Sequence, residues 1–208
     1  QRQHGDPMEN NDTFAQATNL GVVSDGTITA NTVLNGAFLS LDGSDDVDIF
    51  KFNVSAPGKT ASLTLRPIGS TYLEGAQNPD GSCTVGTTFN SLIVKNLGIE
   101  LISSDASTVL ASADVNGAGQ TESIVTIPLP GGTGPFFVRV FGGAVDSVQL
   151  YEFDLAVAAG SSGALDHFAI ETIATQQGVN QTFAVTLNAE DIFNGPAASF
   201  NGTVNLSL

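Results

Sequence analysis

Tryptophan is absent from this 208-residue chain, and cysteine and histidine are rare. Cys83 is the only cysteine, so no disulfide can form within the chain, and we expect a buried or inert thiol. A catalytic cysteine would need a histidine partner, but His4 and His167 both lie near the edges of the expected modules. Two isolated histidines cannot make a zinc site of the usual three protein ligands, and neither an HExxH nor a G-x-S-x-G motif occurs. We therefore expect no catalytic centre.

Basic residues are also scarce. Six Lys and Arg stand against 21 Asp and Glu, which gives a formal net charge of −15. A polyanion would be repelled, so nucleic-acid binding is excluded. No apolar run approaches the roughly 18 residues of a membrane-spanning helix, so no membrane span is expected. Such acidity favours solubility, cation binding, or both.

The abundant residues favour an all-β fold with a real core. Hydrophobic residues make up 41% of the chain and charged residues 13%, so the composition does not predict disorder. Frequent Gly, Ser, Thr, Asn and Val favour strands and turns over helices. Alternating or continuously apolar stretches predict strands near 26–33, 36–41, 48–54, 61–66, 92–102, 107–113, 121–129, 136–141 and 149–157.

Two segments interrupt this pattern. Thr13–Leu20 has its apolar residues on one helical face and predicts a short N-terminal helix, which either Asp12 or Thr13 can cap. Residues 68–90 are rich in Gly, Ser, Thr and Asn and predict a long surface loop. Tyr72 lies in this loop and is our candidate contact for an extracellular polymer, because aromatic rings provide stacking surfaces.

The last part of the chain is expected to be a separate, partial module. Small residues at 159–165 predict a linker, and 166–208 contains three alternating stretches, at 167–170, 182–187 and 202–208. A whole immunoglobulin-like sandwich needs about seven strands and about 100 residues. Either more chain follows, or the piece completes its sheet against a neighbour. The expected organisation is a leader at 1–12, a β-sandwich at 13–158, the linker, and a partial immunoglobulin-like module at 166–208.

An acidic, turn-forming stretch precedes the strand at 48–54. Asp42, Asp45, Asp46 and Asp48 offer carboxylates there, and calcium takes six to eight oxygen ligands. Like charges about 5 Å apart repel by roughly 1–3 kcal/mol per pair, so clustering them without a cation is costly. The alternative is a solvated turn whose aspartates cap local amides, and the loop alone favours that alternative.

The leader offers the other half of a possible site. Glu9, Asn11 and Asp12 would add oxygen ligands if the leader folds back onto the acidic turn. If the two segments meet, they form the two sides of one calcium site. If they lie apart, the acidic stretch is a solvated turn.

Several short motifs together carry a family resemblance over residues 8–158. They are Glu9-Asn10-Asn11-Asp12-Thr13 with Ala15 and Ala17, Asp46-Val47-Asp48-Ile49-Phe50-Lys51-Phe52, Phe137-Val138-Arg139-Val140, and Tyr151-Glu152-Phe153-Asp154-Leu155. In order and spacing they resemble the bacterial pre-peptidase C-terminal domain. The resemblance implies a jelly-roll-like β-sandwich that is not itself catalytic and is exported with hydrolases, often peptidases, to the medium or the cell surface. Some relatives bind calcium between the N-terminal segment and the acidic loop, and some bind collagen or other polymers.

The two ends of the chain carry weaker resemblances. From Asp166 onward, the stretches Phe168-Ala169-Ile170, 183–191 and 200–204 are similar to the opening strands of bacterial immunoglobulin-like repeats. Residues 1–6 are similar to the end of the last helix of matrixin-type metallopeptidases, which implies a catalytic domain upstream.

With the resemblance added, the sequence favours a calcium-stabilised accessory module of an exported hydrolase, for attachment to a substrate or surface such as a collagen-like protein or a polysaccharide. The alternative is a structural or adhesive segment of a multi-domain bacterial surface protein, joined to neighbouring immunoglobulin-like repeats. A free-standing hydrolase with paired carboxylates is a distant third.

Overall fold

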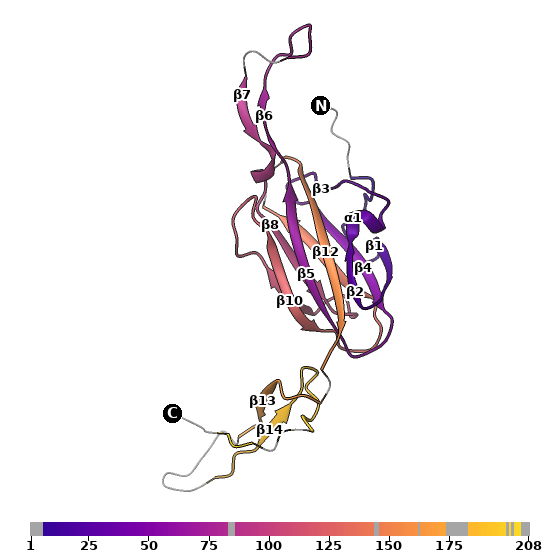
Figure 1. The fold of residues 1–208 in the computed structure, drawn as a ribbon, viewed down its shortest axis with the longest axis vertical. Helices are drawn as coiled ribbons and strands as arrows, with labels where there is room; N and C mark the ends of the chain where they lie inside the picture. Colours follow the sequence, from indigo (N-terminus) through magenta and orange to yellow (C-terminus); the bar gives the residue numbers. More distant parts are fainter. Residues whose placement is uncertain are drawn as a thin grey trace. The chain divides into compact units, whose positions relative to one another are not determined.

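The computed structural model describes residues 6–82, 86–143, 146–161, 163–173, 183–198, 200 and 202–204 (Figure 1). The chain divides into two compact units, Gln1–Ala158 and Ala159–Leu208. Cys83 and residues 1–5 lie outside the described residues. The expectation for the Cys83 thiol and the resemblance of residues 1–6 to a metallopeptidase helix therefore concern a part of the chain that the structure does not describe.

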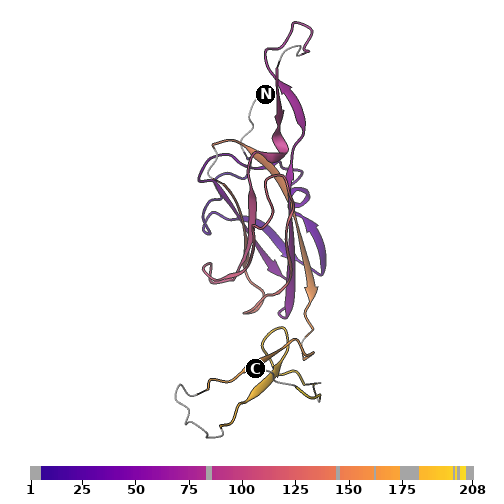
Figure 2. The ribbon, with the colours of Figure 1, turned by 90° about the vertical axis from the view of Figure 1, so that its left-hand side faces the viewer.

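The first unit is a β-sandwich, as its sequence pattern predicts; Figure 2 shows the two layers. One sheet has the strand order β1 (Thr18–Val23), β4 (Val47–Val54), β11 (Phe136–Gly142), β8 (Leu97–Ile102) and β9 (Val109–Ala113). The other has the order β10 (Glu122–Pro128), β5 (Lys59–Ile68), β12 (Gln149–Ala159) and β2 (Gly26–Thr29), and β3 (Leu39–Leu41) also pairs with β12. β1 runs parallel to β4. The pairs β4–β11, β11–β8, β8–β9, β10–β5, β12–β2 and β12–β3 are antiparallel.

Side chains of alternating positions fill the space between the sheets. In β4, Phe50 and Phe52 are fully buried, and Phe50 meets Phe153 of β12 edge-on with ring centroids 5.0 Å apart. Tyr151 and Leu155 continue the same face of β12. Each large side chain removed from water contributes about 1.5–3 kcal/mol, so this row holds the two layers together.

The helix predicted over Thr13–Leu20 is wrong in position. Residues 13–16 form a turn in which the Gln16 N–H donates to the Thr13 carbonyl at 3.0 Å, and β1 begins at Thr18. The apolar side chains that suggested a helix instead cover the outer face of the first sheet. Phe14 packs edge-on against Phe137, with ring centroids 5.1 Å apart.

The short helix lies farther along, in a stretch predicted as a strand. The strand β2 stops at Thr29, and Ala30–Val33 form α1. The Leu34 N–H donates to the Ala30 carbonyl at 2.9 Å, and the Asn31 amide donates to the Ala37 carbonyl at 3.1 Å, which turns the chain toward β3. None of the helices among the described residues is long and apolar enough to cross a membrane.

The predicted long loop contains a β-hairpin. β6 (Thr71–Glu74) pairs with β7 (Thr87–Asn90), and Figure 1 shows this hairpin projecting from one end of the sandwich. The 3₁₀ helix η1 (Ser91–Ile93) follows at its base, so the strand predicted at 92–102 begins only at Leu97. The two strands of the hairpin are joined at the base, because the Ser91 N–H donates to the Ser70 carbonyl at 3.0 Å.

The second unit has a small two-stranded sheet, and of the three expected stretches only 167–170 forms a strand among the described residues. β13 (His167–Ile170) pairs antiparallel with β14 (Leu187–Glu190). Residues 183–186 and 202–204 are not strands, and the remaining residues of those two predicted strands (182 and 205–208) lie outside the described part of the chain. The Asp191 carboxylate accepts the N–H groups of Phe193 and Gly195, both at 2.9 Å, and thereby orders the turn after β14.

Candidate metal centre

The leader folds back onto the sandwich at the acidic turn. The Asn11 carbonyl accepts the N–H of Ile49 in β4 at 3.0 Å. Nearer the N-terminus, the Asp6 carboxylate accepts the N–H of Ser40 in β3 at 3.0 Å. These two attachments lead residues 6–12 across the ends of β3 and β4. The two segments that the sequence could not place relative to each other therefore meet.

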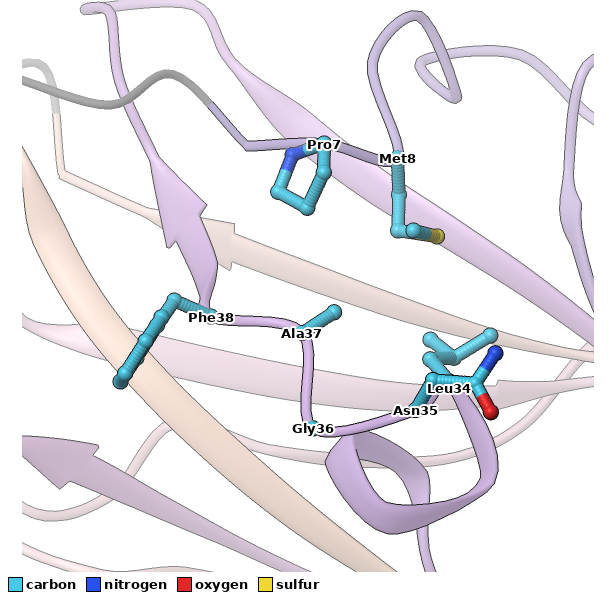
Figure 3. A pocket seen from close by; sticks show the side chains of 7 residues that line it. All are labelled: Pro7, Met8, Leu34, Asn35, Gly36, Ala37 and Phe38. Atoms are coloured by element: carbon cyan, nitrogen blue, oxygen red, sulfur yellow. The ribbon is translucent and has the colours of Figure 1, made fainter.

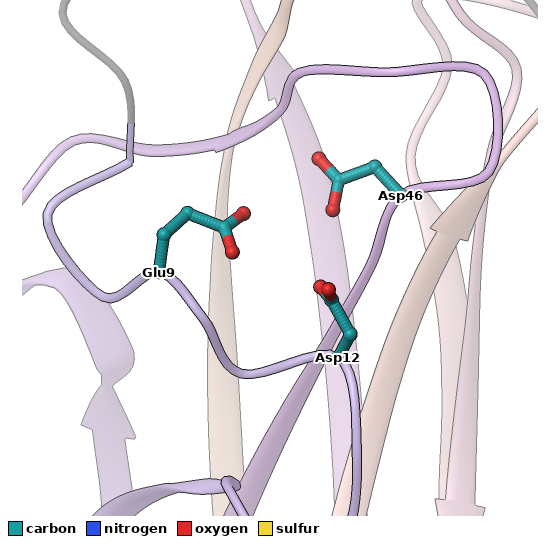
Figure 4. A group of neighbouring side chains, drawn as sticks. All are labelled: Glu9, Asp12 and Asp46. Carbon is teal, nitrogen blue, oxygen red and sulfur yellow. The ribbon is translucent and has the colours of Figure 1, made fainter.

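Three carboxylates converge where the leader and the turn meet (Figure 4). Glu9, Asp12 and Asp46 each offer one oxygen, and these three oxygens lie within 4.8 Å of one another. Oxygens bound to one calcium ion at 2.3–2.6 Å are separated by at most about 5 Å. The spacing of the three carboxylates therefore fits a single shared calcium ion.

Two buried polar side chains belong to the same segments. The Asn11 side chain is fully buried, and neither its oxygen nor its nitrogen has a hydrogen-bond partner. Asp48 is also fully buried; its Oδ2 accepts the hydroxyl of Tyr151, and its Oδ1 has no partner. A buried polar atom left unpaired costs about 1–3 kcal/mol, so such atoms call for a ligand, an ion or a water molecule.

Glu9, Asp46 and Asp48 hold their protons more tightly than isolated carboxyls. Desolvation, followed by the charges of Asp46 and Asp12, raises the pKa of Glu9 to about 7. Burial raises the pKa of Asp48 to about 8, although the Tyr151 hydroxyl acts in the opposite direction. Desolvation likewise raises the pKa of Asp46. A bound cation would relieve this repulsion, because it favours the ionised form of every carboxylate around it.

The turn that presents Asp46 is held from both sides. The Asp42 N–H donates to Asp46 Oδ2, and the Ser40 hydroxyl donates to Asp42 Oδ1 at 2.7 Å. From the core side, the ammonium of Lys95 donates to the Gly43 carbonyl, although this lysine is only 1% exposed. Burial lowers the pKa of Lys95, while the neighbouring charges of Asp46 and Asp42 act in the opposite direction.

The predicted metal-site residues take four different positions. Three converge as carboxylates, namely Glu9, Asp12 and Asp46. Asn11 and Asp48 contribute buried oxygens from the same two segments, and Asp42 shapes the turn through its N–H and its carboxylate. Asp45 is exposed and lies outside the three-carboxylate group.

Sequence reasoning missed Asp6 and Lys95. Asp6 stands in a Gly-Asp-Pro stretch that has the composition of a linker, and nothing local indicates its burial. Lys95 is the only basic residue between Arg66 and Arg139 and directly follows the apolar Leu92-Ile93-Val94. That isolation within an apolar stretch was the available signal for a buried lysine.

Tyr72 lies on the projecting hairpin, apart from the acidic cluster. Its ring packs against Phe89 of the paired strand, with centroids 5.4 Å apart, and the residue remains 39% exposed. The neighbouring Leu73 is 49% exposed. The hairpin thus presents apolar and aromatic side chains to solvent without burying them in the sandwich core.

A shallow hollow of about 400 Å³ lies beside the leader (Figure 3). Pro7 and Met8 line one side, and residues 34–38 line the other. Phe38 stands at its edge with 71% of its surface exposed. The hollow shares the leader with the acidic cluster, because Glu9 directly follows Met8.

Comparisons with known proteins find similarity at the level of structure and not of sequence. No family model and no curated protein matches the sequence. The chain is similar to a solved structure described as the pre-peptidase C-terminal domain of collagenase from Bacillus anthracis. The TM-score is 0.35 at 16% identity, and the match covers 68% of this chain and 96% of the other. A likeness at this level carries no information on ligand or activity.

Proposed function

We propose that this chain is a non-catalytic, calcium-stabilised accessory module of an exported hydrolase, in particular a peptidase. The observation that carries the proposal is the convergence of Glu9 and Asp12 from the leader with Asp46 from the turn. The motif resemblance over residues 8–158 supports the accessory role. In such a module the cation would hold the leader against the sandwich, and other surfaces of the module would bind the substrate or the cell surface.

Calcium fits the donors better than the other common metals. The group consists of carboxylate oxygens, with the buried amide of Asn11 and the free oxygen of Asp48 in the same two segments. Zinc and copper favour nitrogen and sulfur ligands, and magnesium demands near-ideal octahedral geometry at 2.0–2.1 Å. Calcium accepts irregular sets of six to eight oxygens at longer distances.

A cation at this position would act as a cross-link. A calcium ion held by Glu9, Asp12 and Asp46 would offset two of their three negative charges and would tie the leader to the turn between β3 and β4. A ligand at about one hundred times its dissociation constant stabilises the folded state by about 2.7 kcal/mol. For a domain of this size that corresponds to a rise in melting temperature of roughly 5–10 °C.

Thermal unfolding with calcium and with chelator tests the proposal. We expect the native protein to melt at a higher temperature in calcium and Asp46→Asn to lose most of that difference, because one of the three oxygens of the site becomes a neutral amide. Asp45→Asn is the matched control. It removes the same charge from the neighbouring residue, which is not one of the three carboxylates of the group. Equal melting temperatures of the native protein in calcium and chelator would sink the proposal.

Attachment to an extracellular polymer, either a collagen-like protein or a polysaccharide, is the role we propose for the hairpin. Its exposed Tyr72 and Leu73 support this assignment, because apolar side chains that pack into no core are available to a partner. The proposed location is outside the cell, in the medium or at the surface.

A structural or adhesive segment of a surface protein is the second candidate. The small β13–β14 sheet favours it, because Phe168 is 37% and Ile170 is 59% exposed there. Such a sheet could be completed by neighbouring immunoglobulin-like repeats. The full gene separates the two candidates, since an upstream metallopeptidase domain supports the accessory role and a long run of repeats supports the adhesive one.

A further inference from the structure

Asp6 is a buried carboxylate in a stretch that has the composition of a linker. Asp6 is only 4% exposed, and both of its side-chain oxygens accept hydrogen bonds. Oδ1 accepts the N–H of Met8 at 2.7 Å, and Oδ2 accepts the N–H of Ser40 in β3 at 3.0 Å. The Asp6 carbonyl also accepts the N–H of Glu9 at 3.2 Å. One residue thus forms the tight turn at 6–9 and fastens it to the sandwich.

Only a carboxylate satisfies this arrangement. Two N–H groups point at the side chain, one from the leader and one from a strand 34 positions along the chain. An asparagine has one oxygen acceptor, and its NH₂ group would face the second N–H donor. The acid is kept there although burial, Asp42 and Asp46 all disfavour its charge and raise its pKa. This position therefore uses a carboxylate where a neutral residue would avoid the electrostatic cost.

We propose that Asp6 is a positioning residue of the cation site, an inference that rests on the proposed function. The leader is fixed at two points, at Asp6 through β3 and at Asn11 through Ile49 of β4. Glu9 lies between these points and Asp12 follows the second one, so both carboxylates are presented by a segment that Asp6 holds in place.

The negative charge of Asp6 and its hydrogen bonds both favour calcium binding at the cluster. Asp6 is one of the charges that disfavour ionisation of Glu9 and Asp48, so its field reaches the cluster although it is not one of the three converging carboxylates. Loss of this negative charge weakens attraction for a cation, and loss of the bond to Ser40 loosens the leader. Both consequences of Asp6→Asn lower the affinity for calcium.

Calorimetric titration of the whole chain with calcium, together with melting in calcium and in chelator, tests the role. We expect Asp6→Asn to raise the dissociation constant about tenfold or more, the scale of one lost hydrogen bond to a charged group. Asp45→Asn again removes the same charge without touching the leader, so it should change the constant by a smaller factor. A merely structural Asp6 would lower both melting temperatures equally and leave the dissociation constant unchanged, which would overturn the inference.

A second variant separates position from charge. Asp6→Glu keeps the negative charge but moves the carboxylate by one methylene, so it should also weaken calcium binding if position matters. Native-like affinity of this variant would contradict the inference, even if Asp6→Asn failed to fold. If the native protein itself shows no calcium binding, the proposed function fails; if it binds and both Asp6 variants bind equally well, only the role of Asp6 fails.

Discussion

Asp48 shows how a single residue can belong to both the core and the candidate site. It occupies an inward position of β4, in phase with Phe50 and Phe52, and is fully buried. Its carboxyl accepts the hydroxyl of Tyr151 from the opposite sheet, which links the two layers at this end of the sandwich. Its raised pKa, about 8, means that part of the cation-free population carries a neutral carboxyl at neutral pH.

Stability without calcium should therefore fall as the pH rises. The folded-state pKa of Asp48 is raised to about 8 and that of Glu9 to about 7, whereas unfolded carboxyls titrate near pH 4. Between these values the folded state binds more protons than the unfolded state, so the free energy of unfolding decreases with increasing pH. Denaturant unfolding in chelator at about pH 5 and about pH 8 measures this slope.

Calcium should reduce or reverse that pH dependence, because ligating carboxylates must lose their protons and the cation binds better at higher pH. Asp48→Asn serves as the control, since it removes the most strongly shifted of these carboxyls and should flatten the slope in chelator. A chelated native protein that is more stable at about pH 8 than at about pH 5 would contradict the assignment of the raised pKa values.

At the scale of residues, the sequence indicated which groups could meet but not how each is used. Four aspartates in one turn and the acids of the leader were visible as candidates, and Glu9, Asp12 and Asp46 do converge. The sequence could not predict that Asp42 would shape the turn while Asp45 would lie exposed outside the three-carboxylate group, because neighbouring turn residues differ only in backbone geometry. The burial of Asp6 depends on an N–H group 34 positions away.

Among the elements, the β6–β7 hairpin is the least integrated part of the first unit. Its strands form a separate two-stranded sheet, and all four residues of β6 are exposed. Strand patterns are recognisable when one face is buried, and here neither face of β6 is, so the sequence of 68–90 resembled a loop. The helix was misplaced for a related reason: Phe14 and Ala17 share one apolar surface in a turn as well as they would in a helix.

Replacing residues 71–90 by a short Gly-containing turn should leave the sandwich intact. The base of the hairpin is already closed by the bond between Ser70 and Ser91, and the deleted strands pair only with each other. We expect the melting temperature to change by no more than about 4 °C, the effect of roughly 1 kcal/mol. A large loss of cooperativity would show instead that the hairpin is part of the fold.

The same variant tests the proposed attachment surface. Retention on insoluble collagen and on insoluble polysaccharide should be lost with the hairpin and weakened by Tyr72→Ala. Val125→Ala is the matched control, because Val125 is 70% exposed on β10 of the sandwich itself. Unchanged retention of the hairpin deletion would move the attachment surface elsewhere.

For the molecule as a whole, the net charge of −15 makes stability depend on salt. In chelator, the repulsion among Glu9, Asp12 and Asp46 is unscreened at low ionic strength, so raising salt from about 0.01 M to about 0.15 M should raise the melting temperature. With calcium bound, the cation would offset most of this repulsion, so the rise in melting temperature should be smaller. If the melting temperature rises equally with salt in calcium and in chelator, repulsion within the cluster does not contribute to the salt dependence of stability.

The arrangement of the sheets in the first unit was predictable, because it follows from the alternation of apolar and polar residues along the strands. Alternating strands with a rich apolar content can only bury their inner faces by stacking two sheets, and the β-sandwich of the first unit follows. The return of the leader to the turn was not predictable in this way, because it depends on a few bonds between segments far apart in the sequence. The bond between Asn11 and Ile49 is one of them.

The register of β12 has a mechanical consequence. This strand begins opposite Leu41, beside the place where Asp6 grips β3, and it runs to Val157 opposite Gly26. Eight residue steps at about 3.4 Å separate these levels by about 27 Å. The chain thus enters the first unit at one end and leaves it at the other, so a force that pulled on residues 6 and 158 would load the strands in shear, with the leader as the attachment at the first end. If the acidic cluster binds calcium as proposed, the calcium concentration would set the force at which the leader detaches from β3 and β4.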